Sequence, residues 1–392
     1  MRILIAFALL ICTALPLWAQ DDAAADDKTF LEGWLQDALS DAGRQVTITG
    51  FQGALSSEAT LQQLTIADAE GPWFILREAR LKWSRSALLR GRLQVDELIA
   101  GRISILRRPA GEDGITPEDA QAYTFALPEL PVSVNVGALR AERIELSEAV
   151  IGEPATLSLT GAFRLEEGEG EGTLDIIRQD RDDALRFTGS FSNATRVLSL
   201  DLDLREAAGG LISQVAGIPG APALRLQVQG DAPLSDFIAQ IALSSDGRPR
   251  LSGTVEIAAE PDETGGGHIF KADLGGDLRP LFQPEFHAFF GQNAGLLAEG
   301  RSWPDGRLSL TQFALNAEAM ELNGQLELTA ERWPERFRLS GQIGRGDGIT
   351  RLPFGGRGAR LNIAQLSATY DAAAGDSWQA KLDIDGFENA QL

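Results

Sequence analysis

The sequence has few of the side chains that carry most protein chemistry. Its 392 residues include one cysteine, Cys12, two histidines, His268 and His287, and two tyrosines. Cys12 lies in an N-terminal apolar segment, so the rest of the chain has no disulfide and no thiol chemistry. Neither histidine has a partner at metal-site spacing, and nucleophile-elbow, phosphate-loop and dinucleotide motifs are absent. The sequence therefore predicts no metal, no cofactor and no enzymatic activity.

Positive charge is also scarce. The chain has 35 lysines and arginines against 56 aspartates and glutamates, a formal net charge of −21. This balance argues against broad nucleic-acid binding and favours a soluble, self-repelling surface. Aromatic residues make up only 7% and glycines number 42, which indicates many turns and a lean interior. The length fits two or three domains or one long repetitive array.

The first 20 residues form a separate segment. Arg2 precedes an apolar run over residues 3–15, Pro16 interrupts it, and Ala19 is a small residue suited to cleavage. Residues 1–20 therefore predict a signal peptide or, if uncleaved, an N-terminal membrane anchor at the lower limit of spanning length. Residues 21–28 form an acidic linker, and we expect everything after them to be exported.

Residues 29–43 predict one amphipathic helix. Its apolar residues recur on a single face, Thr29 and Glu32 can form a capping box, and Gly43 suits the C-terminal end. Two interpretations remain open. The helix plugs the end of a β-structure, or it lies on a membrane surface, although its polar face is acidic.

From residue 44 to 392 the dominant pattern is the period of two that is typical of strands. In residues 197–204 four leucines alternate with serine and aspartate. This pattern predicts an antiparallel sheet with one apolar and one solvated face. Residues 93–105 also align with residues 134–146 at an offset of 41, matching Val95 with Val136 and Leu98 with Leu139. The irregular spacing of the repeats excludes a strict solenoid.

A second repeat places a glycine inside a strand pattern. Five copies of apolar–small polar–Gly–x–apolar occur, and each glycine shares the parity of the apolar positions. Glycine weakens a strand but permits a bend and leaves room on its face. We therefore expect five glycines to point to the apolar side and keep it free of bulk: Gly161, Gly189, Gly253, Gly324 and Gly341.

One segment runs against the acidic character of the chain. Residues 77–108 hold nine positive and three negative side chains. Near a membrane-directed N-terminus they could meet anionic lipid headgroups. Alternatively they form a basic outer face that pairs with acidic strands elsewhere. The predicted membrane-proximal basic patch comprises Arg77, Arg80, Lys82, Arg85, Arg90, Arg92, Arg107 and Arg108.

Residues 48–109 resemble the N-terminal signature of the TamB family, which belongs to the AsmA-like superfamily. The positions that carry the resemblance are Asp68, Gly71, Trp73, Trp83, Leu88, Leu89, Gly91, Val95, Leu98 and Pro109. Weaker similarity extends over residues 29–392. The family is usually much longer, and this chain ends within a repeat. We therefore expect an N-terminal fragment that lacks the family's C-terminal domain.

The resemblance implies an all-β fold, an elongated, curved antiparallel sheet that forms a half-open hydrophobic groove or β-taco. It also implies an inner-membrane anchor, a periplasmic location in a Gram-negative bacterium, and phospholipids as ligands. Such proteins are implicated in phospholipid transport to the outer membrane and in assembly of outer-membrane proteins and autotransporters with a TamA-like outer-membrane partner. That partner would bind through the missing C-terminal region. The alternative is a periplasmic scaffold or chaperone without lipid conduction.

On this interpretation, apolar strand positions line the groove. Because each methylene exposed to water costs about 0.8 kcal/mol, a sixteen-carbon chain crossing water faces a barrier of about 12 kcal/mol, which a groove would lower without catalysis. The expected lining residues are Val95, Leu98, Val136, Leu139, Leu198, Leu200, Leu202, Leu204, Val255, Ile257, Leu326, Leu328, Leu361 and Ile363.

Overall fold

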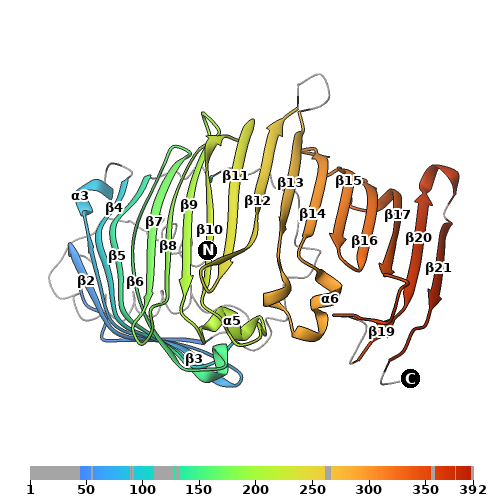
Figure 1. Ribbon diagram of the computed structural model, residues 1–392. Helices are drawn as coiled ribbons and strands as arrows, with labels where there is room; N and C mark the ends of the chain where they lie inside the picture. Colours follow the sequence, from blue (N-terminus) through green and yellow to red (C-terminus); the bar gives the residue numbers. More distant parts are fainter. Residues whose placement is uncertain are drawn as a thin grey trace. The chain divides into compact units, whose positions relative to one another are not determined.

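The computed structural model describes residues 45–53, 56–88, 90, 92–109, 127–128, 133–260, 266–354, 358–375 and 377–389. The predicted signal segment, acidic linker and amphipathic helix lie outside these residues. Most of the described residues are in strands, and nineteen strands belong to one long mixed sheet (Figure 1). None of the helices in the described part is long and apolar enough to cross a membrane.

The chain divides into two compact units, and each is described by itself. Unit 1 contains residues up to 194 apart from 116–126, and its strands pair in chain order. Its elements are β1 (Gln45–Thr49), β2 (Glu58–Asp68), β3 (Gly71–Trp83), α3 (Arg85–Leu88), β4 (Arg92–Ile105), β5 (Ser133–Leu146), α4 (Glu148–Ile151), β6 (Ala155–Glu166), β7 (Glu169–Arg178) and β8 (Ala184–Ser192).

Unit 2 begins at residue 195, and all its strand pairs are antiparallel. Strand β17 pairs with β20, and the short β18 and β19 form a separate hairpin. The elements are β9 (Val197–Glu206), α5 (Leu211–Val215), β10 (Leu224–Pro233), β11 (Asp236–Ser245), β12 (Arg248–Ala259), β13 (His268–Gly276), η3 (Arg279–Leu281), η4 (Pro284–Phe286), α6 (His287–Phe290), β14 (Ala294–Ser302), β15 (Leu308–Ala317), β16 (Met320–Leu328), β17 (Pro334–Gly344), β18 (Thr350–Arg351), β19 (Arg360–Leu361), β20 (Ile363–Asp371), η5 (Ala372–Ala374) and β21 (Trp378–Asp385).

Strands β4 and β5 pair in parallel, so the prediction of an antiparallel sheet is wrong at this point. The register joins Val95 to Val136 and Leu98 to Leu139, which is the offset of 41 found in the sequence repeat. Parallel neighbours need a connection of a dozen or more residues, and residues 106–132 provide one. The repeat therefore reflects two strands that run in the same direction and lie side by side.

A seam crosses β2 to β5 where the register omits four aligned residues: Gln62, Glu78, Gly101 and Glu142. Glu78 has a φ of 56°, and a Cβ at Gly101 would lie 2.9 Å from its Oε2. In β3 the apolar side chains that align with those of β4 are at even positions before Glu78, namely Phe74 and Leu76, and at odd positions after it, namely Ala79 and Leu81. The irregular residues thus keep the apolar side chains on one face of the sheet along the whole strand.

Each unit holds one packed cluster of buried apolar side chains, and other buried apolar residues such as Phe237 lie outside these clusters. In unit 1, Leu93, Val95, Val134 and Val136 pack together with Trp83 and Phe163 around them. In unit 2, α6 inserts Phe289, which is 1% exposed, against the ends of the neighbouring strands. Helices α5 and α6 both lie at the strand ends drawn at the bottom of Figure 1. Each cluster closes only part of the apolar face of its unit.

Candidate functional site

The main candidate site is the apolar face of unit 2. Register carries one uninterrupted row of apolar side chains and glycines across every strand of its sheet: Leu202, Val228, Ile241, Gly253, Leu274, Leu296, Leu315, Leu322, Gly341, Leu366 and Leu382. No member of this row is buried, and Leu382 at the edge is 61% exposed. A second layer packed on this face would bury such central leucines, so the row presents accessible apolar surface.

The opposite face of unit 2 carries polar side chains. Asp201 of β9 aligns with Gln229, Gln240 and Thr254 on the following strands. Because successive side chains in a strand point to opposite faces, each strand separates the leucine row from this polar row. The sheet of unit 2 is thus amphipathic, as its period of two predicts.

Most sequence-predicted lining residues of unit 2 lie on the apolar face. These are Leu198, Leu200, Leu202, Leu204, Val255, Ile257, Leu326 and Leu328. Two do not lie with them. Leu361 is 4% exposed in the cluster around Phe289, and Ile363 pairs with Gly344 at the parity of Gln365 on the polar face.

In unit 1 the predicted lining residues lie on that unit's own apolar face. Val95 and Val136 are 5% and 4% exposed in the buried cluster, and Leu98 and Leu139 pack against it. Val95 and Val136 are therefore covered by protein, whereas Leu98 and Leu139 are partly buried. Sequence reasoning also missed members of the unit 2 row such as Val228, Leu274 and Leu366, because cross-strand register leaves no mark within a single strand.

All five predicted glycines share the parity of the apolar positions. For example, Gly161 pairs with Leu174, and Gly324 pairs with Phe313 and Leu339. They do not leave open space, however. A Cβ at Gly253 or Gly341 would collide with a carbonyl oxygen of the adjacent strand, and at Gly189 it would lie 2.7 Å from the ring of Phe187. Close approach of neighbouring groups therefore favours glycine at Gly161, Gly189, Gly253 and Gly341, whereas at Gly324 the atoms nearest to a Cβ are 3.3 Å away.

The predicted basic patch does not form one cluster. Arg77, Arg80 and Lys82 lie on the polar face of β3, and Arg92 begins β4. Exposed Arg90 lies just before β4, near the same end. At the other end of β4, Arg107 binds Asp68 and the carbonyl oxygen of Gly71, and Arg108 donates to the carbonyl oxygen of Val150. The Arg85 side chain lies outside the described part.

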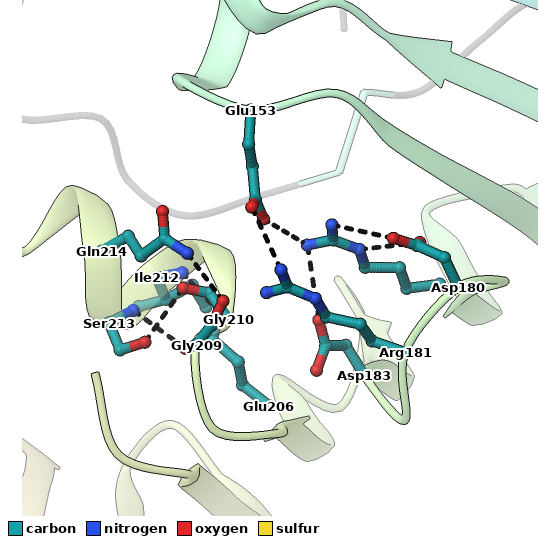
Figure 2. Close-up of polar contacts among 11 residues, drawn as sticks. Glu153, Asp180, Arg181, Asp183, Glu206, Gly209, Gly210, Ile212, Ser213 and Gln214 are labelled. Carbon is teal, nitrogen blue, oxygen red and sulfur yellow. Dashed lines mark hydrogen bonds and ion pairs between the residues drawn. The ribbon is translucent and has the colours of Figure 1, made fainter. Parts of the chain in front are cut away.

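Unit 1 also holds a network of charges around Arg178. The Arg178 side chain is 3% exposed and lies 2.9 Å from Asp180 and 2.8 Å from Glu153. Figure 2 shows Arg181 reaching the same Glu153, at 3.2 Å. The hydrogen bond from Arg178 lowers the pKa of Asp180. Every charge here has an opposite partner, so the network anchors the turn between β7 and β8.

In unit 2, Glu206 holds the loop that carries α5. Its carboxylate is buried and accepts hydrogen bonds from the backbone amides of Ile212 and Ser213, the latter at 2.8 Å (Figure 2). Gln214 donates to the carbonyl oxygen of Gly209 at 2.7 Å. These bonds satisfy the first amides of the short helix, so Glu206 has a structural role.

On the polar face of unit 2, Asp203 lies between Arg225 at 2.9 Å and Arg205 at 2.6 Å. Hydrogen bonds from Arg225 and then Arg205 lower the pKa of Asp203 to about 2 from 3.8. Because the folded-state pKa lies below the unfolded-state value, this pairing stabilises the fold above about pH 4 and is lost as the pH falls toward 2.

We expect Asp203→Asn to lower the free energy of unfolding by about 1 kcal/mol at pH 7, since both arginines are half exposed and screened by water. At pH 2 the difference from the unaltered protein should approach zero. Urea titrations between pH 7 and pH 2 measure this. Asp201→Asn on the same strand is the control, because within the described residues the side chain of Asp201 has one polar partner, Gln229 at 3.4 Å. An equal loss for both variants would contradict the assignment.

Cavities and metal-ligand clusters point to no other site. A cavity of about 310 Å³ lies between β16, β17, β20 and β21, and polar side chains such as Arg338, Thr369 and Gln379 line much of it. The described residues contain no group of histidine, cysteine or carboxylate side chains able to hold a metal ion. No protein-family model, curated protein or solved structure matches the chain. The candidate site is therefore defined by its geometry.

Proposed function

We propose that this protein is an inner-membrane-anchored periplasmic protein that shields phospholipid acyl chains on their way to the outer membrane. The observation that carries the proposal is the uninterrupted row from Leu202 to Leu382, in which no side chain is buried. A soluble protein rarely leaves so much contiguous apolar surface exposed unless something binds to it.

The chemistry of such a face suits acyl chains. Half-buried leucine, valine and isoleucine side chains can cover methylene groups, and each methylene covered saves about 0.8 kcal/mol. The lipid headgroup stays in water. Movement along the face needs no bond to be made or broken, which agrees with the scarcity of histidine and cysteine in the sequence.

Within unit 2 the accessible part of the face is the middle of the strands. In α6, the ring of Phe289 makes edge-to-face contacts with Phe290 and Phe354 and lies in the same buried cluster as Ala364. Strands β9 to β15 contribute no residue to this cluster. We therefore expect acyl chains to contact positions such as Leu200, Leu326 and Leu339 rather than Leu361.

The resemblance to the TamB family supports the membrane anchor, the periplasmic location and a TamA-like outer-membrane partner as further parts of the proposal.

A photo-crosslinking amino acid placed on alternate residues tests the proposal. At Leu200 and Leu326 we expect phospholipid adducts in cells, because both lie on the apolar face. At Asp201, which follows Leu200, and at Gln325, which precedes Leu326, the side chain points to the polar face, so we expect no phospholipid adduct. Mass spectrometry of the adducts identifies the lipid class.

Two results would overturn the proposal. One is an equal yield of lipid adducts on both faces, which would indicate contact without specificity. The other is the absence of phospholipid from organic extracts of the folded, purified protein together with no adduct at Leu200. Introducing aspartate at Leu200 or Leu326 should in turn lower lipid crosslinking at neighbouring apolar positions.

A second candidate is a scaffold for outer-membrane protein biogenesis, and β21 favours it. This strand pairs with β20 alone among the described strands, and Trp378, Leu382 and Ile384 are at least half exposed on it. An edge strand of this kind can accept another strand by backbone pairing. Protein adducts instead of lipid adducts in the same crosslinking experiment would support this function.

A further inference from the structure

Unit 1 carries an arrangement of arginines on its polar face that the sequence patch does not describe. Arg77 of β3 pairs in register with Arg102 of β4, which in turn pairs with Arg143 of β5. Like charges at directly opposed positions of neighbouring strands destabilise a sheet. Three in a row across three strands, in a chain of net charge −21, call for an explanation beyond solubility.

A second row lies on the same face. Arg80 and Arg140 occupy the aligned positions on either side of Ile99, and Lys82 follows Arg80 by two residues. The pairing with β6 shows that the two rows share a face. Arg140 of the second row pairs with Thr160, and Glu145, which lies two residues after Arg143 of the first row, pairs with Thr156. Thr156 and Thr160 are four residues apart on a regular strand, so their side chains point to the same face. We call Arg77, Arg80, Lys82, Arg102, Arg140 and Arg143 the cationic face.

Carboxylates compensate this charge only in part. Glu145 lies 2.7 Å from Arg143 and 3.8 Å from Arg102, and Glu97 lies 3.0 Å from Lys82. Glu78 and Glu142 occupy the seam between the two rows. The side chains of Arg102 and Arg143 remain 48% and 49% exposed, and no ion pair of Arg80 or Arg140 occurs within the described residues.

The form of the cationic face selects the kind of ligand. Neighbouring strands lie about 4.8 Å apart, so each row spans about 10 Å of a surface with exposed guanidinium groups. A single small anion would need an enclosing pocket, whereas many phosphate groups on a plane can each contact one arginine. The acidic remainder of the chain opposes binding of a long, flexible polyanion such as nucleic acid.

We infer that the cationic face docks unit 1 on the phosphate headgroups of an anionic lipid bilayer. This inference rests on the proposed function, because a protein that carries acyl chains must meet a bilayer to exchange them. It adds Arg102, Arg140 and Arg143 to the contact and leaves out Arg107 and Arg108, whose guanidinium groups are occupied by Asp68 and by the carbonyl oxygen of Val150.

A local probe tests the docking. A fluorophore on Thr160→Cys, next to Arg140, with Cys12→Ser to leave one thiol, reports the approach of vesicles that carry a headgroup-attached quencher. With the full chain we expect quenching by vesicles of 30% phosphatidylglycerol in phosphatidylcholine, and little by phosphatidylcholine alone. Each basic residue near an anionic surface raises the affinity for the vesicle roughly fivefold, so R102Q/R143Q should lower the vesicle affinity measured by quenching roughly 25-fold.

The control variant is R336Q/R345Q, which removes the same charge from unit 2, where both arginines are about half exposed and paired with carboxylates. It should stay within about twofold of the unaltered chain. Equal quenching for R102Q/R143Q and the unaltered chain would overturn the inference. So would saturable binding of inorganic phosphate without vesicle quenching, which would assign the arginines to a free anion.

The two proposals fail separately. Lipid crosslinking at Leu200 depends on the apolar face of unit 2, whereas vesicle quenching at Thr160 depends on the cationic face of unit 1. Loss of crosslinking with quenching intact would reject the proposed function and keep the docking surface. If the unaltered chain shows lipid crosslinking at Leu200 but no vesicle quenching at position 160, the docking surface alone is rejected.

Discussion

Arg178→Ala is expected to lower the free energy of unfolding by about 3 kcal/mol at pH 7. The guanidinium group of Arg178 is buried and forms ion pairs with Asp180, Glu153 and Asp183, the last at 3.6 Å. Removing it leaves the carboxylates of Asp180, Glu153 and Asp183 close to one another and takes away the charge that neutralises them. The value falls at the lower end for a broken buried pair, because Asp180 is 49% exposed and water can solvate it.

Urea unfolding measures this loss, and Arg186→Ala on the adjacent strand is the matched control. Arg186 pairs with Asp175 at 3.3 Å, but its side chain is 63% exposed, so its removal should cost less than about 1 kcal/mol. Arg178→Lys should fall between the two, since lysine keeps the charge but loses the planar fork that binds two partners. Similar losses for Arg178→Ala and Arg186→Ala would show that the Arg178 network does not hold the β7–β8 turn.

Gly253→Ala is expected to lower the free energy of unfolding by about 3 kcal/mol. The added Cβ would collide with the carbonyl oxygen of Asp273 on β13, and that oxygen belongs to the backbone and cannot rotate away. Strands β12 and β13 would have to separate locally, which weakens the hydrogen bonds around the Gly253–Leu274 pair.

Gly324→Ala is the control, because the same sequence pattern surrounds it but its nearest neighbours are 3.3 Å away. We expect a change within about 1 kcal/mol, measured by the same urea titration. If both substitutions are equally mild, the glycines of the repeat do not mark close strand approach. If both substitutions lower the free energy of unfolding by the same large amount, the loss comes from a property common to the repeated pattern and not from the local contact with Asp273.

Alternation within a strand fixes which side chains share a face, so the leucines of β9 and the glycines of the repeat were assigned correctly relative to their neighbours along the chain. It fails where the strand is interrupted. Ile363 follows the break at Asn362 between β19 and β20, so it lies on the other face from Leu361 although the two residues have the same parity.

Contacts between distant segments escape the sequence for a related reason. The offset of 41 was visible as a repeat, but only the path of the connection between β4 and β5 makes the two copies parallel neighbours. The same pairing brings Arg102 beside Arg143, which are far apart in the chain. The predicted basic patch holds three of the six residues of the cationic face and leaves out Arg102, although Arg102 lies within residues 77–108. It also includes Arg107 and Arg108, which lie at the other end of the strands.

The sequence by itself determined the mostly β character and the amphipathic faces, because composition and the period of two act within each strand. The tertiary structure decided the strand partners and their directions. It also decided that Val95, Val136 and Leu361 are buried while the row from Leu202 to Leu382 is not. Burial depends on which strands and helices pack together, and helix α6 reaches only the strands near β16 to β20.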